Sequence, residues 1–165
     1  MKNVNSLSEN EFILIFGSVF EKSEWIAIET FKQAPFENTQ DLIKKMVSNF
    51  NNCSDKEIFK ILNLHPKLAI EKKLTNLSSK EQIGAKLDTC SKEELEEFEN
   101  LNIKYQEKFK FPFIIAIKGK DKNEILSNFR KRIKNDYETE FKEAKIQVQK
   151  IASFRLNDIL GQASY

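Results

Sequence analysis

The chain is poor in the residues that interrupt helices. Only four glycines and three prolines occur among its 165 residues. The stretches between them are rich in Lys, Glu and Leu, which favour helix. We therefore expect an all-α fold, built as a single multi-helix domain over residues 1–165. The fourteen phenylalanines predict a core that is rich in aromatic rings.

Helix starts are indicated by a spacing in which a serine precedes a glutamate by three residues. In such a capping box, the serine side chain and the glutamate side chain each accept a hydrogen bond from the other's backbone amide. The spacing occurs in four pairs: Ser8 with Glu11, Ser54 with Glu57, Ser78 with Glu81, and Ser91 with Glu94. Helical periodicity and Pro or Gly stops then predict where the helices end. The helices that begin at Ser8, Ser54 and Ser91 are expected to end near Phe16, at His65 and near Phe109. Four others are expected from Ser23 to before Pro35, from Thr39 to near Phe50, from Asp121 to near Asn135, and from Tyr137 to Leu160, before Gly161.

One apolar run does not fit this helical pattern. It reads Phe111-Pro112-Phe113-Ile114-Ile115-Ala116-Ile117. The run is short, and the proline near its start fixes the backbone and removes an amide donor. We expect a buried extended segment here.

Charge and cysteine content exclude several classes of function. The formal net charge is +2 with both signs spread along the chain, so neither nucleic acid nor an anionic membrane is an expected partner. The densest basic run, residues 130–134, is interpreted as a solvated helix face. Cys53 and Cys90 lack metal-ligand spacing, which predicts no metal site and two reduced thiols. Together with the lack of an apolar leader or membrane span, this favours a cytoplasmic protein.

His65 is the single histidine and precedes Pro66 at a predicted helix end. Ile58, Ile61 and Leu62 lie seven, four and three residues before it, so all four side chains share one helix face. One interpretation is a core histidine bonded to a carbonyl. The other is a catalytic group, because imidazole titrates near neutral pH and a side chain at a helix end often points into a cleft.

Arg155 lies near the middle of an apolar stripe on the last predicted helix, formed by Phe141, Ala144, Val148, Ile151, Ala152 and Ile159. A guanidinium among core positions keeps its charge and needs an anion or carbonyls around it. The partner is either an internal acid, such as Glu81, or the carboxylate of a substrate. Both interpretations stay open from the sequence.

The stretch Ser78-Ser79-Lys80-Glu81-Gln82 also has two interpretations. The simpler one is a capping box that starts a helix. However, Glu81 lies off the apolar face expected for that helix, which is formed by Ile83, Leu87 and Cys90. Its carboxylate is therefore available to face solvent or a site.

Several short motifs follow one another in a fixed order. They are Phe16-Gly17, Phe20-Glu21 with Trp25, Pro35-Phe36, His65-Pro66-x-Leu68-Ala69, Ser78-x-x-Glu81-Gln82-x-x-Ala85-x-Leu87, Leu101-Asn102-x-x-Tyr105, Lys108-Phe109-x-Phe111-Pro112-Phe113-Ile114 and Ile151-Ala152-x-x-Arg155-Leu156. In this order and spacing, over roughly residues 7–160, the chain resembles the family of 2-oxo-4-hydroxy-4-carboxy-5-ureidoimidazoline (OHCU) decarboxylases.

The resemblance implies an all-α enzyme, often a homodimer, that uses no metal or organic cofactor. Its substrate is a small ureide, which loses CO2 to give (S)-allantoin during urate degradation. His65 would correspond to the family's catalytic histidine, and we hypothesise that Glu81 shares the handling of protons. Substrate contacts would come from Arg155, Pro66 and two segments, Ser78, Ser79, Lys80, Glu81 and Gln82, and Phe113, Ile114, Ile115, Ala116 and Ile117.

Three lysines depart from the family pattern. Lys67 replaces an aspartate and brings a positive charge next to His65. Lys86 and Lys110 replace glycines. If Lys86 lies inside a helix, the loss of glycine favours stability, whereas Lys110 would be strained wherever a positive φ is required.

Two alternatives remain from the sequence. The chain could be a non-catalytic helical interaction module on the same fold, although His65, Glu81 and Arg155 are all present. It could also decarboxylate a related ureide or hydantoin acid.

Overall fold

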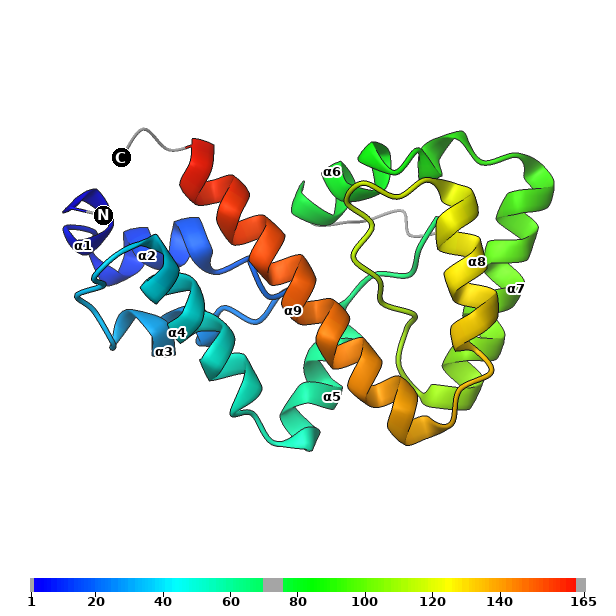
Figure 1. Cartoon of the computed structure of the whole chain (residues 1–165), viewed down its shortest axis with the longest axis horizontal. Helices are drawn as coiled ribbons and strands as arrows, with labels where there is room; N and C mark the ends of the chain where they lie inside the picture. The colour runs from blue at the N-terminus through cyan, green and yellow to red at the C-terminus, as the bar shows by residue number, and fades with distance from the viewer. Residues whose placement is uncertain (1, 70–75, 163–165) are drawn as a thin grey trace. The chain divides into compact units, whose positions relative to one another are not determined.

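The computed structural model describes residues 2–69 and 76–162. These residues form helices and contain no strand, which confirms the all-α prediction (Figure 1). The elements in chain order are α1 (Lys2–Asn5), α2 (Glu9–Phe16), α3 (Trp25–Phe31), α4 (Thr39–Asn51), α5 (Asp55–Leu64), α6 (Asn76–Gly84), the 3₁₀ turn η1 (Leu87–Thr89), α7 (Lys92–Phe109), α8 (Lys122–Arg132) and α9 (Tyr137–Gln162).

The chain divides into two compact units. The first contains the chain up to Ile61 and from Gln149 onward, and the second contains Leu62–Val148. Helices α5 and α9 each contribute residues to both units. The single domain over residues 1–165 stays a prediction.

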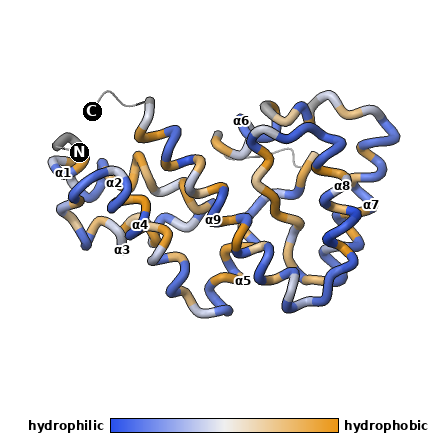
Figure 2. Tube along the Cα trace, in the orientation of Figure 1, coloured by the Kyte–Doolittle hydropathy of each residue, from blue (hydrophilic) through white to orange (hydrophobic). Residues whose placement is uncertain are grey.

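The first unit packs α2, α3 and α4 around phenylalanine rings. The Phe12 ring lies 4.6 Å from Phe16 and 5.4 Å from Phe31, centroid to centroid. The Phe20 and Phe50 rings stack at 4.9 Å. These pairs confirm the expected aromatic core, and the hydrophobic positions line the inner sides of the helices (Figure 2).

The second unit packs α7 and α8, which lie side by side, against residues 111–117 (Figure 1). All seven residues of this segment are buried, and the six other than Pro112 belong to the apolar core. They lie outside any helix or strand. The Phe113 ring stacks on Phe129 at 3.9 Å, and the edge of Tyr105 meets Phe113 at 5.3 Å. The predicted buried, non-helical segment is confirmed.

Three of the four predicted capping boxes are present. Ser8, Ser54 and Ser91 bond with their glutamates at the starts of α2, α5 and α7. The fourth prediction is wrong because Ser78 and Glu81 lie inside α6. Asp121 with Glu124 forms a capping box that was not predicted.

Other helix ends differ from the expectations. Ser23 does not cap α3; its hydroxyl donates to the Glu21 carbonyl instead. Helix α8 ends at Arg132 rather than near Asn135, and α9 continues through Gly161 to Gln162. A glycine has no side chain that prevents helical geometry, so it permits a helix end without enforcing one.

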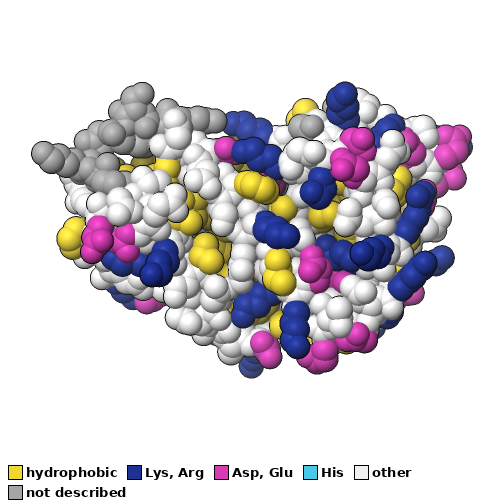
Figure 3. Space-filling view, viewed as in Figure 1, with side chains coloured by type: hydrophobic (Ala, Val, Ile, Leu, Met, Phe, Trp, Pro, Cys, Tyr) yellow, Lys and Arg dark blue, Asp and Glu magenta, His cyan; other side chains and the backbone are white. Residues whose placement is uncertain are grey.

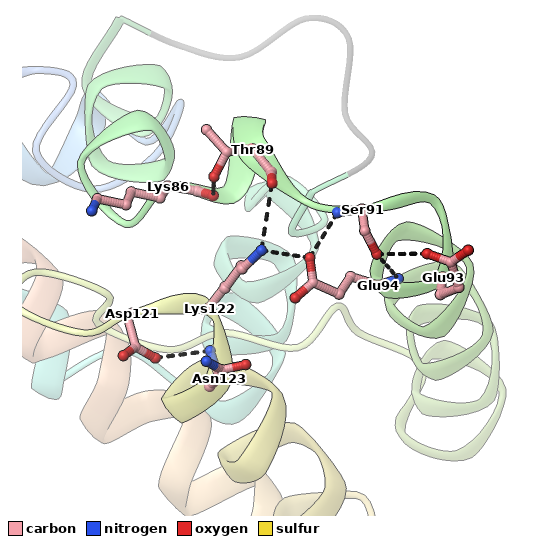
Figure 4. Close-up of polar contacts among 8 residues, drawn as sticks. All are labelled: Lys86, Thr89, Ser91, Glu93, Glu94, Asp121, Lys122 and Asn123. Carbon is pink, nitrogen blue, oxygen red and sulfur yellow. Dashed lines mark hydrogen bonds and ion pairs between the residues drawn. The ribbon is translucent and has the colours of Figure 1, made fainter.

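The short turn between α6 and α7 joins the N-terminal ends of α7 and α8 (Figure 4). The Lys122 ammonium bonds to Glu94 Oε2 at 2.6 Å and to the Thr89 carbonyl at 3.4 Å. Glu94 in turn accepts from the backbone of Ser91. This ion pair holds the carboxylate pKa of Glu94 below its usual range.

Three of the described lysines, Lys22, Lys86 and Lys110, adopt the left-handed backbone conformation. Lys86 has φ 57° and precedes η1, and Lys110 has φ 63° at the C-terminal end of α7. Lys86 lies outside α6, which ends at Gly84, so the helix stabilisation considered for this lysine does not apply. The expected strain at Lys110 is confirmed, since L-residues with side chains disfavour this region.

Among the described residues, no helix combines the length and hydropathy of a membrane span. Acidic and basic side chains alternate on the face drawn in Figure 3. They form no large field of one sign there, in agreement with the balanced composition.

Candidate functional site

His65 directly follows α5. Its backbone amide donates to the Leu62 carbonyl at 3.2 Å, which closes the last turn of the helix. The residue is only 8% exposed, and Ile58, Ile61 and Leu62 on the same face are fully buried. The predicted location of His65 on the apolar face at a helix end is confirmed.

The loop after His65 is held by two buried amide side chains of the second unit. Gln82 Oε1 accepts from the Ala69 amide at 3.1 Å, and Gln82 Nε2 donates to the Lys67 carbonyl at 3.4 Å. Asn102 Nδ2 donates to the Leu68 carbonyl at 3.2 Å. Three consecutive backbone residues are therefore fixed by side chains from α6 and α7.

This loop contains a strained residue, because Ala69 has φ 65°. An L-residue adopts this conformation only where its surroundings enforce it. The contacts of Gln82 with residues 67 and 69 provide that enforcement. Gln82 was predicted to be a substrate ligand, and its contact with this loop was not anticipated. Asn102 appeared only within a motif.

Helix α6 presents two of its predicted site residues to the interior. Ser78 and Gln82, four residues apart on one helix face, are 4% and 8% exposed. Ser79 and Glu81 are half-buried, and Lys80 is exposed. The expectation that Ile83 lies on a buried apolar face of this helix is wrong, since its side chain is 57% exposed. The buried face of α6 is polar at these two positions, as a site wall would be.

The buried segment 111–117 has backbone groups in two different states. The Ile114 carbonyl accepts from Arg132 Nη1 at 2.7 Å, and the Ala116 amide donates to Gln147 Oε1 at 2.9 Å. The amides and carbonyls of Phe113 and Ile115 make no hydrogen bond within the part of the chain that the structure describes. Buried backbone groups normally have partners, so these can meet the polar groups of a ligand.

Arg155 lies in the first unit and is 3% exposed. Its Nη1 bonds to Glu21 Oε2 at 3.1 Å and to the carbonyls of Ser18 and Val19 at 3.3 Å. Of the two interpretations, the structure shows an internal ion pair, and the acid is Glu21 rather than Glu81. The joint action of Arg155 with His65 stays a prediction.

Arg132 was missed because the basic run around it was interpreted as a solvated face. Arg130 does lie on the surface, where it pairs with Glu97, but Arg132 is 5% exposed and pairs with Glu140. The signal was available, since Arg132 follows the core residues Ile125 and Phe129 by seven and three positions.

Metal binding finds no support in the side chains. Within residues 2–69 and 76–162, no group of three or more His, Cys, Asp or Glu residues lies close enough to hold a metal ion. The polar groups described above are instead amides, backbone groups and one imidazole, which suit a small organic molecule.

These features place the chain among all-helical proteins with a candidate small-molecule site in the second unit. A model of the OHCU decarboxylase family matches residues 5–157. Since the match spans most of the sequence, the chain belongs to the OHCU decarboxylase family.

Two relatives illustrate the range of sequence similarity. The uric acid degradation bifunctional protein of Bacillus sp. (strain TB-90) is 40% identical over 162 residues, 98% of this chain and 32% of the relative. The chain thus spans about a third of the length of that relative. The 2-oxo-4-hydroxy-4-carboxy-5-ureidoimidazoline decarboxylase of Haloferax volcanii is 32% identical over 94% of this chain and 93% of the relative.

Two crystal structures share the fold. That of (S)-allantoin synthase superposes with a TM-score of 0.79 at 28% identity, covering 96% of this chain and 52% of the other. That of OHCU decarboxylase in the presence of (S)-allantoin gives 0.75 at 23% identity, covering 94% and 100%. The second likeness concerns the fold alone.

Proposed function

We propose that the chain catalyses the decarboxylation of 2-oxo-4-hydroxy-4-carboxy-5-ureidoimidazoline to (S)-allantoin in urate degradation, without a metal or organic cofactor. Membership of the OHCU decarboxylase family supports this activity, as do the names of full-length relatives. The observation that carries the proposal is His65, buried at the end of α5 and followed by a loop that Gln82 and Asn102 hold in place.

The reaction breaks the bond between the ring carbon and its carboxylate. CO2 leaves from the ring carbon that also carries the hydroxyl, and the electron pair moves into the bond to the neighbouring ureido-bearing carbon, whose C=N bond accepts the charge. A proton delivered to one face of that neighbouring carbon sets the (S) configuration, while the hydroxyl loses its proton and becomes the ring carbonyl of allantoin. The protein must therefore orient the ring, stabilise the developing charge and supply the proton stereospecifically.

His65 and Glu81 are the proposed proton-handling groups. A positioned acid or base contributes roughly 10²–10⁴-fold to the rate of such a step. His65 is buried and Glu81 is half-buried, so both are partly shielded from bulk water.

The remaining predicted residues would bind the ureide. The amide and carbonyl groups of Phe113 and Ile115, which make no hydrogen bond among the described residues, would complement the N–H and C=O groups of the ring. Arg155 would attract the carboxylate, with Glu21 balancing its charge in the meantime. Pro66 and residues 78–81 complete the proposed contacts. Gln82 acts through the loop that it holds, since both ends of its amide bond there.

Substitution of His65 tests the proposal. The substrate is generated in situ from urate, and its disappearance is followed against the spontaneous decay. We expect His65→Asn to lose the acceleration while keeping the helical circular dichroism spectrum. Leu64→Asn is the matched control, because it introduces the same side chain one residue earlier, at a position 38% exposed.

The outcomes separate the alternatives. An active His65→Asn variant would make His65 a core residue. A wild-type protein that accelerates nothing would favour a non-catalytic helical module, and one active only on other ureide or hydantoin acids would favour a related decarboxylase. Activity that survives extensive chelation and dialysis is expected from a cofactor-free reaction.

The assembly and compartment are also part of the proposal. We expect a homodimer, as the family resemblance implies, and sedimentation equilibrium measures it. A cytoplasmic location fits the two free cysteines, which persist in a reducing compartment.

A further inference from the structure

The geometry points to Arg132 as a positioning residue that fixes the substrate-binding segment 113–117 from behind. This inference rests on the proposed function, which makes that segment a wall of the site. Arg132 was absent from the predicted site residues. It lies at the end of α8, outside the three motifs that contribute the proposed substrate contacts in this unit.

Arg132 contacts two consecutive residues of the segment. Its Nη1 donates to the Ile114 carbonyl at 2.7 Å, and its guanidinium carbon lies 4.6 Å from the centre of the Phe113 ring. The same ring stacks on Phe129 at 3.9 Å. Phe113 is therefore in contact with two groups of α8, a cation and an aromatic ring.

The guanidinium is itself held in one orientation. Its Nε and Nη2 donate to Glu140 Oε1 at 2.9 and 2.5 Å, and Asn135 Nδ2 donates to Glu140 Oε2 at 2.7 Å. The Tyr105 hydroxyl also donates to Glu140. Burial and the Glu140 charge raise the pKa of the Tyr105 phenol above its usual range, so it remains a donor. Every polar group of this cluster is satisfied in a fixed geometry.

A second anchor holds the segment two residues later. Gln147 Oε1 accepts from the Ala116 amide at 2.9 Å, and its Nε2 bonds to Glu143 at 2.7 Å. Arg132 and Gln147 thus fix residues 114 and 116. Ile115 between them keeps an amide and a carbonyl without a hydrogen bond among the described residues. The two anchors define where these unpaired groups point.

Arg132→Lys tests this role with little change in charge. A lysine ammonium can pair with Glu140, but it lacks the planar fork that reaches the Ile114 carbonyl at the same time. We expect kcat/KM to fall roughly tenfold or more, because a misplacement of about 1 Å can lower the reaction rate about 100-fold. We expect most of this loss as a higher KM, since the segment binds the ring, and a smaller part as a lower kcat. Arg130→Lys, the same substitution two residues away on the exposed face, should leave both parameters unchanged.

Hydrogen exchange supplies a readout that does not depend on activity. We expect the backbone amides of Ile115 and Ala116 to exchange faster in Arg132→Lys than in Arg130→Lys, with the overall helical spectrum retained. Tyr105→Phe removes one donor to Glu140 and should give exchange rates between those of the two arginine variants. It replaces Arg132→Lys in the test if that variant does not fold. Unchanged exchange and an unchanged KM in these variants would overturn the inference.

The two proposals fail differently. If the wild-type protein shows no decarboxylase activity but Arg132→Lys still loosens residues 115 and 116, the proposed function fails and the anchoring stands. If the wild-type protein is active and Arg132→Lys matches Arg130→Lys in KM and in exchange, the anchoring fails and the function stands.

Discussion

Each unit of the molecule contains one buried arginine paired with a buried glutamate. In the second unit, Glu140 accepts two bonds from Arg132, at 2.9 and 2.5 Å. In the first unit, Arg155 reaches Glu21 at 3.1 Å and two backbone carbonyls at 3.3 Å. The pair in the second unit has the shorter contacts, with two guanidinium nitrogens donating to one carboxylate oxygen, and short charge-assisted hydrogen bonds are the stronger ones.

The difference between the two ion pairs indicates that the two buried arginines have different roles. Arg132 uses its fork on Glu140 and on the Ile114 carbonyl, so it anchors backbone. Arg155 is the residue that the family resemblance associates with the substrate carboxylate. A buried ion pair is weak evidence for stability, because desolvation offsets the attraction. Its value here lies in holding a defined geometry.

The largest expected effect comes from breaking the shorter pair. Arg132→Met should lower the free energy of unfolding by about 3–5 kcal/mol, because it leaves a buried carboxylate without its cation. Arg155→Met should cost less stability and should raise KM. Urea unfolding followed by circular dichroism measures the first quantity, and steady-state kinetics the second. Equal stability losses would contradict the ranking of the two pairs.

Removing both partners of the shorter pair should cost less than the two single losses combined. Arg132→Met with Glu140→Leu is expected to show a coupling energy of about 0.5–3 kcal/mol in a double-mutant cycle. Recovery should be partial, since Tyr105 and Asn135 lose their acceptor. Strictly additive losses would mean that Arg132 and Glu140 do not stabilise one another.

A smaller effect is expected at Lys110, which leads into the segment that Arg132 anchors. Lys110→Gly should gain about 0.5–1 kcal/mol, because glycine tolerates the φ of 63° without strain. Lys104→Gly, at an exposed position within α7, should instead lose about 1 kcal/mol. Thermal unfolding compares the two variants. A lower stability of both variants than of the wild-type protein would show that the strain at Lys110 is negligible.

The smallest effect is expected at the exposed counterpart of Arg132. Arg130 bonds to Glu97 through two nitrogens, but the side chains are 56% and 36% exposed. Solvent screens such a pair, so Arg130→Met should leave the unfolding midpoint unchanged within error. A loss comparable to that of Arg132→Met would show that burial is not what separates the two arginines.

Much of the fold could be predicted because it depends on local signals. Capping pairs such as Ser91 with Glu94 determine helix starts within a few residues of sequence. Residues 111–117 were recognisable as non-helical because Pro112 and a short apolar run are local features as well. Ser78 with Glu81 shows the limit of this reasoning. The same spacing lies inside α6, where Ser78 is buried rather than at a helix start.

The site was predictable where a residue contrasted with its surroundings. His65 and Arg155 stood out as polar groups on apolar faces, and both are buried. Arg132 was hidden because its neighbours are also basic, and its partner Glu140 follows other acidic residues. The loop contacts of Gln82 and Asn102 join residues 13 to 34 positions apart, and no local pattern reports such pairings.

The stereochemistry of the product tests the central claim most directly. The unstable substrate is generated from urate with the two preceding activities, and circular dichroism follows the allantoin that forms with and without the purified protein. Spontaneous decay gives a racemate and no signal. We expect the protein to accelerate the decay and to give the (S) signal, and His65→Asn to give neither. A racemic product at the uncatalysed rate with wild-type protein would contradict the account.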